Sequence, residues 1–586
     1  IGGSRLLAAL NIEPEVYHLN EGHAAFAVLE RARQYMIKTG QPFDVALTVT
    51  RVGNLFTTHT AVPTGFDHFT PALMEQYLGE YGERELGLKC HQLLALGRQD
   101  PDNETEKFNM AYLAIRGSGA INGVSQLHGR VSRHIFSNLF NRWPIIEVPV
   151  EHVTNGVHMP SWDSAEADKF WTSACGKTRW LGTLECLQDN IRKVSDEQFW
   201  SLRNTQRMHL IKFVRQHLSK QLAMIGASQE EIADTQNVFH PEVLTICFAK
   251  RFTVYKRPTL LLKDAKRLLR LLSNSDRPVQ IIIAGKAHPS DKTAQALIKE
   301  WIHFIQLNHI GHRLVFLQDY DMLLTSRLVQ GVDVWLNTPQ RPWEACGTSG
   351  MKVLVNGGLN VSELDGWWSQ AYTPELGWSL GDRQEHSSDP GWDAKEAQTF
   401  YDLLEQEVIP AFYNRNQHGI PMAWVTKMRE SMAQLTPLFS ANRAMRQYTE
   451  QHYLPAAKAY QERVADNGAM GVSISEWQQN LSKYWETLRF GDVTIETSET
   501  EHFFSVEIYF DHLDPKAIKV ELYANGLNCV EPERIEMTAI QQLENGSLYS
   551  ASVPVLRAAK DYTPRIIPHF SGAIIPLEAN QILWQN

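Results

Sequence analysis

Asn337-Thr-Pro-Gln-Arg-Pro-Trp-Glu-Ala-Cys-Gly-Thr-Ser-Gly-Met-Lys352 follows directly on the apolar run Val332-Asp-Val-Trp-Leu336. The apolar run predicts a buried strand, and the glycine-rich segment predicts a short helix with Lys352 about one turn from its start. Glycine and small hydroxyl residues at such a junction leave backbone N–H groups free to face an anion. Lys352 could supply an ammonium for a phosphate or an amine for a Schiff base. An ordinary turn with a solvated lysine fits the spacing equally well.

The flanking segments alternate between strand and helix patterns. Strands are predicted over 243–248, 279–283, 314–317 and 332–336, and helices over 258–272, 292–306 and 322–330. Strands that are apolar throughout and alternate with helices indicate parallel βαβ units, whose ligands lie beyond the carboxyl ends of the strands. The chemistry-bearing motifs of this half all follow predicted strands: Lys250-Arg251, Gly285-Lys286, Tyr320 and Glu344 to Lys352.

The rest of the chain continues the α/β alternation and then changes character. Before residue 154 the patterns predict strands over 15–19 and 144–150, a strand followed by a loop over 55–63, and helices over 22–38, 44–51, 102–116 and 124–139. Further helices are predicted over 196–225, 397–415, 422–438 and 441–466. After a loop-like break at 466–471, alternating patterns predict half-buried antiparallel strands over 493–497, 503–510 and 518–523. We expect a small all-β domain over 493–586 that serves packing or interaction.

Composition excludes several classes of function. The chain has 586 residues and a net charge of −10, so it lacks the basic footprint of a nucleic-acid binder. No apolar run approaches the length of a membrane span. The cysteines are scattered without a C-x-x-C pair, which favours reduced thiols in a cytoplasmic protein. They are Cys90, Cys175, Cys186, Cys247, Cys346 and Cys529.

A second motif, Phe248-Ala-Lys-Arg-Phe-Thr-Val-Tyr-Lys-Arg257, places four cations within eight residues. Arginine can bind a phosphate through two parallel N–H bonds, whereas lysine acts as a point charge. At a strand-to-helix junction the run therefore suits a phosphate. A solvated basic turn is the commoner explanation of such a run when it stands alone.

Glu344-Ala-Cys-Gly-Thr-Ser-Gly-Met-Lys352 resembles the pyridoxal-phosphate attachment segment of the α-glucan phosphorylases, and most closely the bacterial and archaeal branch with Glu-Ala-Ser-Gly-Thr-Ser-Gly-Met-Lys. The resemblance implies that Lys352 holds pyridoxal 5'-phosphate as an imine, with Thr348 and Ser349 also at the cofactor. The substrate-binding residues that it implies here are Glu344, Ala345, Cys346 and Gly347. Cys346 departs from the usual serine.

The basic motif resembles the same family's Lys-Arg-x-x-x-Tyr-Lys-Arg segment. This implies that Lys250 and Lys256 serve the cofactor phosphate, and that Arg251 and Lys256 serve the substrate phosphate. With Lys352 these are the expected catalytic residues, while Tyr255 would contact the sugar. Thr253 stands where the animal and major bacterial enzymes have histidine, a departure that the bacterial and archaeal branch shares.

Three other segments resemble segments of the same family and occur in the same order along the chain. Thr57-Thr-His-Thr60 implies that His59 borders the glucose site, although His59 alone would suit a hydrogen-bonded core position. Thr154-Asn-Gly-Val157, with Trp162 after it, implies Asn155 on the sugar and Trp162 near the cofactor. Phe316-Leu-Gln-Asp-Tyr320 implies Tyr320 near the pyridine ring. No metal site is indicated, because the histidines lack partners at metal-ligand spacing.

The resemblance implies an α/β fold of two Rossmann-like domains facing across a cleft, of glycosyltransferase-B type, with a small C-terminal all-β domain. The expected domains are 1–153, 154–466 with the pyridoxal-phosphate site and return helices, and 493–586. The implied reaction is phosphorolysis of terminal α-1,4-linked glucose of glycogen, starch or maltodextrin by inorganic phosphate, giving glucose 1-phosphate with retention. A nucleotide-sugar glucosyltransferase of the same fold and an inactive glucan-binding relative are the alternatives. Glucan length, allosteric control and oligomeric state stay open.

The first residues of the chain, Ile1-Gly-Gly-Ser-Arg-Leu-Leu7, correspond to the middle of the first domain in the family that the chain resembles. In the family an upstream portion supplies further strands and a glycine-rich loop over the phosphates. We therefore expect these residues to belong to a longer natural chain or a truncated gene product, with little phosphorolysis by the 586-residue piece alone.

Overall fold

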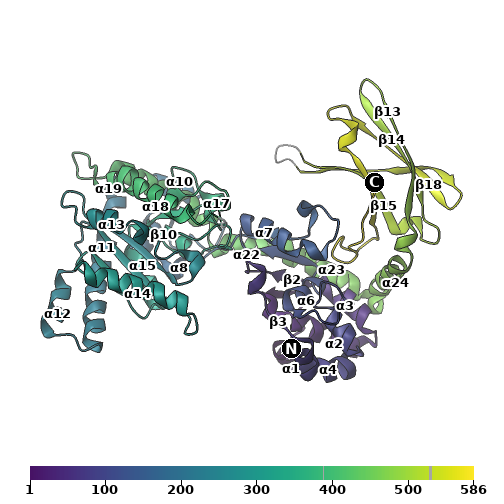
Figure 1. Cartoon of the computed structure of the whole chain (residues 1–586), viewed down its shortest axis with the longest axis horizontal. Helices are drawn as coiled ribbons and strands as arrows, with labels where there is room; N and C mark the ends of the chain where they lie inside the picture. Colours follow the sequence, from purple (N-terminus) through teal and green to yellow (C-terminus); the bar gives the residue numbers. More distant parts are fainter. Residues whose placement is uncertain (387–388, 527–530, 586) are drawn as a thin grey trace. The chain divides into compact units, whose positions relative to one another are not determined.

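The computed structural model describes residues 1–386, 389–526 and 531–585 (Figure 1). Cys529 lies outside the described residues, and the other five cysteines are free thiols. The chain forms two compact units. The first comprises Ile1–Gly123, Gly129–Glu151 and Thr449–Asn586, and the second comprises Val124–His128 and His152–Tyr448. Both units contain parallel strands, so the expected mixed α/β class is confirmed.

A six-stranded sheet in the order β12-β11-β10-β7-β8-β9 forms the centre of the second unit (Figure 1). All of its pairs are parallel, as the apolar strand patterns predict. Its strands β7 to β11 are buried throughout, except for Arg251 and Lys286 at the carboxyl ends of β7 and β8. The strands are β7 (Leu244–Arg251), β8 (Val279–Lys286), β9 (Leu314–Leu317), β10 (Val334–Asn337), β11 (Leu359–Glu363) and β12 (Trp378–Leu380).

Three of the helices that follow strands begin at aspartate caps. The side chains of Asp264, Asp291 and Asp321 accept backbone N–H groups in the first turns of α13 (Ala265–Leu272), α14 (Lys292–Leu307) and α15 (Met322–Gly331). The helix predicted over 258–272 therefore starts later, and a 3₁₀ turn precedes it. The long α11 (Asp196–Met224) packs beside α15.

The remaining α-helices of this unit are α8 (Met159–Trp162), α9 (Ala165–Cys175), α10 (Leu187–Arg192), α12 (Gln229–Asp234), α16 (Ser349–Lys352), α17 (Trp368–Ala371), α18 (Trp392–Leu403), α19 (Ile409–Tyr413), α20 (Met422–Glu430), α21 (Thr436–Leu438) and α22 (Ala441–Tyr448).

The first unit has a smaller sheet in the order β1-β2-β5-β6, with β1, β2 and β5 parallel. These strands are β1 (Tyr17–Asn20), β2 (Asn54–Thr57), β5 (Ala120–Gly123) and β6 (Glu151–His152). A short antiparallel pair joins β3 (His68–Phe69) and β4 (Phe108–Asn109). The helices are α1 (Gly2–Ala9), α2 (Phe26–Thr39), α3 (Phe43–Arg51), α4 (Pro71–Leu86), α5 (Cys90–Ala95), α6 (Met110–Arg116) and α7 (Gln126–Phe136).

The C-terminal segment of the first unit is rich in antiparallel strands, as the alternating pattern predicts. Two four-stranded sheets have the orders β13-β14-β18-β17 and β16-β15-β19-β20. The strands are β13 (Arg489–Thr497), β14 (Glu501–Tyr509), β15 (Ile518–Ala524), β16 (Glu533–Glu536), β17 (Thr538–Leu543), β18 (Gly546–Pro554), β19 (Thr563–Pro568) and β20 (Leu583–Trp584). The preceding helices are α23 (Leu454–Val464) and α24 (Ala469–Tyr484).

Two buried arginines, Arg463 and Arg565, join this C-terminal segment to the first 151 residues. Arg463 forms a 2.6 Å ion pair with Glu578 and donates to the Thr48 carbonyl, with both charged side chains buried. Arg565 pairs with Glu521 at 2.7 Å and with Glu147. These contacts account for the grouping of the β-strands with the first sheet in one compact unit.

Two expectations about secondary structure are wrong. Residues 102–107 form turns, because Arg98 donates to the Glu104 and Glu106 carbonyls, and only α6 is helical in the span 102–116. The predicted strand over 144–150 is instead a 3₁₀ turn, with the Glu147 N–H donating to the Pro144 carbonyl. Helix α24 was not predicted.

Among the described residues, no helix has both the length and the apolar character of a membrane span.

Asp333 anchors the sheet of the second unit at the start of β10. Its carboxylate accepts Arg207 Nε at 3.0 Å, the Thr245 N–H at 2.9 Å and Arg203 Nη2 at 3.4 Å, and the three charged side chains are fully buried. Removing one partner from such a network leaves an uncompensated buried charge.

We expect Asp333→Asn to lower the free energy of unfolding of the second unit by about 3–5 kcal/mol. Urea denaturation, with amide hydrogen exchange in β7 and β10 to identify the unit, measures the loss. Glu185→Gln, which breaks the exposed 3.4 Å pair with Arg446, is the control and should cost less than about 1 kcal/mol. Equal small losses in the two variants would contradict this account.

Candidate functional site

Two loops meet beyond the carboxyl ends of β7 and β10. Lys250 and Arg251 end β7, and Lys256 lies in a following 3₁₀ turn, Val254–Lys256. Glu344 belongs to the loop after β10. The Lys256 Nζ atom lies 2.6 Å from Glu344 Oε2, and both side chains are buried. The neighbouring strands β7 and β10 therefore bring the two predicted motifs together.

The buried charges of this cluster do not balance. Burial, and then the Lys256 ammonium, lowers the pKa of Lys250 from 10.5 to about 7. Burial also opposes the charge of Lys256, but the Glu344 carboxylate outweighs it and raises the pKa of Lys256. Burial would raise the pKa of Glu344, yet Lys256 and Lys250 lower it below its usual value. One carboxylate thus faces two buried lysines, so a bound anion would complete the charge balance.

Arg251 and two tyrosines border this lysine cluster. Arg251 is exposed, and its side chain forms no hydrogen bond or ion pair among the described residues, so its guanidinium is available to a ligand. Burial raises the pKa of Tyr255, whose ring lies 5.0 Å from Lys256 Nζ. The Tyr320 hydroxyl donates to the Ala249 carbonyl at 3.1 Å, which holds Tyr320 beside the end of β7.

Hydrogen bonds made by main-chain groups fix the loop from Glu344 to Gly347. The Glu344 N–H donates to Asp365 Oδ2 at 2.9 Å, the Ala345 carbonyl accepts Ser125 Oγ at 2.6 Å, and the Cys346 carbonyl accepts the Trp367 N–H at 3.0 Å. Gly347 has a φ of 80°, which favours glycine at this bend. Burial raises the pKa of Cys346 to about 12, so its thiol stays protonated, and the loop contacts do not depend on a serine there.

Lys352 is the last residue of the short helix α16 and lies about one turn from its start, as the glycine-rich pattern predicts. Its Nζ atom lies 3.9 Å from the centroid of the Trp162 ring. Burial lowers the pKa of Lys352, and no carboxylate among the described residues pairs with it. At the start of α16, Thr348 is the N-cap residue, and Ser349 Oγ accepts a hydrogen bond from Trp335 Nε1 at 3.1 Å. A lysine with a depressed pKa is a suitable amine nucleophile.

Two further predicted sugar-binding residues, Asn155 and His59, belong to different units. Asn155 lies in the second unit, where its N–H donates to the Val124 carbonyl at 3.1 Å. His59 belongs to the first unit and is exposed, and its N–H donates to Glu21 Oε2 at 2.6 Å. Thr60 Oγ1 donates to the same oxygen at 3.1 Å. Glu21 therefore fixes the loop that carries His59.

Sequence reasoning missed Arg257 and Asp365. Arg257 pairs with Glu363 at 3.1 Å and with Glu396, and it donates to the Thr338 and Pro339 carbonyls, so it joins the two site loops. Asp365 holds the Glu344 N–H, and burial raises its pKa to about 7. Two features of the sequence could have indicated them: Arg257 is the last cation of the basic run, and Asp365 is an acidic residue just after the strand β11.

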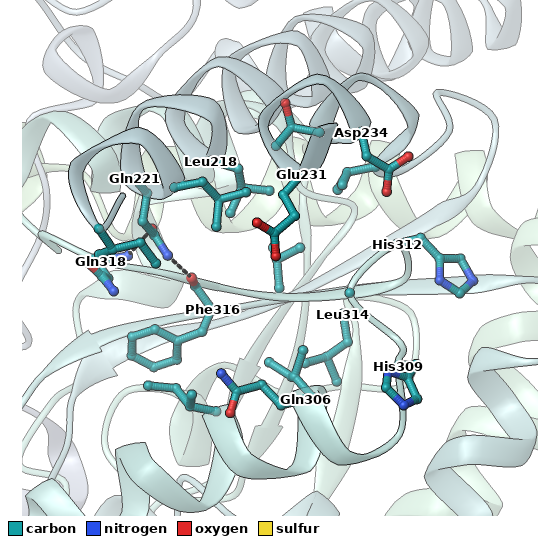
Figure 2. Close-up of a pocket in the computed structure, with 18 residues that line it drawn as sticks. Leu218, Gln221, Glu231, Asp234, Gln306, His309, His312, Leu314, Phe316 and Gln318 are labelled. Atoms are coloured by element: carbon teal, nitrogen blue, oxygen red, sulfur yellow. Dashed lines mark hydrogen bonds between the residues drawn. The ribbon is translucent and has the colours of Figure 1, made fainter. Parts of the chain in front are cut away.

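A cavity of the second unit lies away from these loops (Figure 2). It measures about 640 Å³ and lies between α11, α12, β9 and α14, with mostly apolar walls. Gln221 enters it and donates to the Phe316 carbonyl at 3.1 Å. No predicted site residue lines it. Within the part of the chain that the structure describes, no group of three or more His, Cys, Asp or Glu side chains is placed to hold a metal.

Comparison with known proteins identifies the family. A family model described as carbohydrate phosphorylase matches residues 9–368, which include all the residues of the candidate site. The chain belongs to the carbohydrate phosphorylase family. The expected kinship with the bacterial and archaeal phosphorylases is confirmed by the relatives that it matches.

Three of these relatives carry phosphorylase names. Glycogen phosphorylase of Mycobacterium tuberculosis is 35% identical over 97% of this chain and 68% of its own length. Maltodextrin phosphorylase of Thermococcus litoralis is 36% identical over 93% of this chain and 63% of its own. Glycogen phosphorylase of Aquifex aeolicus is 34% identical over 76% of this chain and 64% of its own. The chain thus spans about two thirds of each relative.

The depressed pKa of Lys250 predicts that anion binding is linked to proton uptake. At pH 8 Lys250 is largely neutral, and a bound anion favours its charged form, so sulfate binding should take up close to one proton. Uptake should vanish below about pH 6, where Lys250 is already charged. Calorimetry in two buffers of different ionisation enthalpy measures the uptake.

Lys250→Met should abolish this uptake, while Lys299→Met, at an exposed lysine in α14, should leave it unchanged. Sulfate is suitable because it does not itself titrate in this range. Uptake of the same size in Lys250→Met would show that another group takes the proton.

Proposed function

We propose that this protein is an α-glucan phosphorylase, a glycosyltransferase that moves terminal α-1,4-linked glucose to inorganic phosphate and releases glucose 1-phosphate with retention. Membership of the carbohydrate phosphorylase family and relatives named glycogen and maltodextrin phosphorylase support this. The observation that carries the proposal is the buried cluster of Lys250, Lys256 and Glu344, because it has more cations than anions at the end of the parallel sheet. Such a cluster suits phosphate groups.

The residues present fit pyridoxal 5'-phosphate. Lys352 has an amine with a lowered pKa and no carboxylate partner, as covalent attachment of an aldehyde requires. Trp162 offers its ring face beside that amine. The Thr253 hydroxyl is buried without a hydrogen-bond partner among the described residues, which leaves a donor for a phosphate oxygen near the lysine pair. Lys352, Trp162, Thr348, Ser349 and Tyr320 would hold the group.

When bound, the cofactor supplies a phosphate whose second pKa lies near ~6 and which can exchange a proton with the substrate phosphate. The chain's own part is to hold the two anions close together. Lys250 and Lys256 neutralise one phosphate, and Arg251 with Lys256 binds the other. Glu344 keeps Lys256 charged and in place. The fixed cations also keep the attacking phosphate beside the positive charge that develops on the sugar.

Sugar recognition falls to Tyr255, Asn155 and His59 together with the loop from Glu344 to Gly347. Main-chain groups hold this loop, so its Glu344, Ala345, Cys346 and Gly347 present a rigid surface to a glucose unit.

We extend the proposal to the domains: 1–153 and 154–466 as Rossmann-like domains of glycosyltransferase-B type that face across a cleft, and 493–586 as a small β domain. The parallel sheets support the two Rossmann-like domains, and the C-terminal antiparallel strands support the β domain, although it packs in one compact unit with the first sheet.

We expect pyridoxal phosphate to become attached to Lys352. Borohydride reduction of the cofactor-loaded protein, followed by peptide mass spectrometry, should find the modification on Lys352 and on no other lysine. Lys352→Arg keeps the charge but should lose the modification. Modification of a different lysine would contradict the assignment. A protein that takes up no cofactor would point to the nucleotide-sugar glucosyltransferase or to the inactive glucan-binding relative.

Arg251→Ala should weaken the use of phosphate far more than the binding of glucan. Loss of a charged two-bond contact costs roughly 2–4 kcal/mol, which is about 30- to 1,000-fold in the half-saturating phosphate concentration. Initial rates with phosphate and maltodextrin varied separately measure the two effects. Arg270→Ala removes another exposed arginine and should change neither. An unchanged phosphate dependence in Arg251→Ala would exclude Arg251 from the site.

A further inference from the structure

Asn356 lies four residues after Lys352, in the 3₁₀ turn Leu354–Asn356, and its side chain is fully buried. Its Nδ2 donates to the Trp162 carbonyl at 2.8 Å and to the Lys352 carbonyl at 3.4 Å. A single amide therefore contacts the main chain of both members of the Lys352–Trp162 pair, although the two residues lie far apart in the sequence.

The orientation of this amide is fixed from its other side. Asn356 Oδ1 accepts the Ser164 N–H at 2.8 Å and Gln206 Nε2 at 3.4 Å. Gln206 is itself held, because its Oε1 accepts Arg203 Nη1 at 2.6 Å and its Nε2 donates to Ser164 Oγ at 2.9 Å. Because donors face Oδ1 and carbonyls face Nδ2, a rotated amide would lose all four contacts.

We propose that Asn356 is a positioning residue for the cofactor lysine: its amide holds the main chain of Trp162 and Lys352 so that the Lys352 amine stays over the indole ring. The role as cofactor lysine rests on the proposed function, whereas the positioning of the amine does not. Without this bridge, the α8 segment that carries Trp162 loses its side-chain link to the turn after α16. The amine then moves from the ring into water.

Other contacts of this turn use main-chain carbonyls and persist when the Asn356 side chain is changed. Trp171 Nε1 donates to the Val355 carbonyl at 2.8 Å, and Arg203 Nη1 donates to the Asn356 carbonyl at 2.9 Å. A variant can therefore fold while the position of Lys352 changes. This separates a positioning role from a role in folding alone.

The test compares Asn356→Leu with Asn337→Leu. Leucine has nearly the shape of asparagine without its polar atoms, and Asn337 is also buried but bonds Ser362 and neither member of the Lys352–Trp162 pair. Competitive labelling of lysines with trace acetic anhydride, read by peptide mass spectrometry across pH, gives the titration midpoint of Lys352 in protein without cofactor. Circular dichroism reports folding.

In Asn356→Leu the Lys352 midpoint should move up toward that of an exposed lysine, so that labelling at pH 8 falls by roughly tenfold for each unit of movement. Asn337→Leu should leave the midpoint at the wild-type value. Gln206→Met, which removes one of the two groups that orient the amide, should give an intermediate movement and serves if Asn356→Leu does not fold. An unmoved midpoint in a folded Asn356 or Gln206 variant, or an equal movement in Asn337→Leu, would overturn the proposal.

A second readout separates this proposal from the proposed function. Pyridoxal phosphate should dissociate severalfold faster from loaded Asn356→Leu than from wild type, as followed by its absorption band. If wild type binds no cofactor, the proposed function fails, but the labelling midpoint still decides whether Asn356 positions Lys352. Equal dissociation rates together with an unmoved midpoint would overturn the positioning role.

Discussion

The ion pair between Lys256 and Glu344 joins the two loops on which the candidate site depends. Each loop starts where a strand of the parallel sheet ends, and β7 and β10 are direct neighbours. Because parallel strands present their carboxyl ends at one edge, residues some ninety positions apart reach 2.6 Å separation without a special fold. Arg257 strengthens this junction through Glu363 and the carbonyls of Thr338 and Pro339.

The same junction explains why the site is suited to phosphate. Burial makes every charge costly, and the single carboxylate of Glu344 compensates only one of the two buried lysines. Lys250 is therefore held close to neutrality until an anion arrives. Lys352 lies in a different environment, over an aromatic ring and without a counter-ion, which favours an uncharged amine. Two lysine chemistries, a charge for phosphate and an amine for an aldehyde, thus arise on adjacent loops.

Much of this arrangement could be predicted from the sequence. The strands β7 to β10 are apolar because both faces are covered, so their positions and parallel direction were evident, as was the short helix that contains Lys352, whereas β11 and β12 were missed. Residues 102–107 and 144–150 were wrongly predicted because local side-chain and proline contacts override the pattern there. Asn356, Asp365 and Arg257 were missed because their partners lie far away in the sequence. The roles of the individual site residues stay predictions.

A crystal structure of the protein loaded with pyridoxal phosphate and soaked with inorganic phosphate tests the central claim most directly. The account predicts continuous density from Lys352 Nζ to the cofactor. It also predicts that the cofactor phosphate lies within hydrogen-bonding distance of Lys250 and Lys256, and that a second phosphate lies against Arg251. Density that leaves the lysine pair without an anion, or a cofactor attached elsewhere, would contradict it.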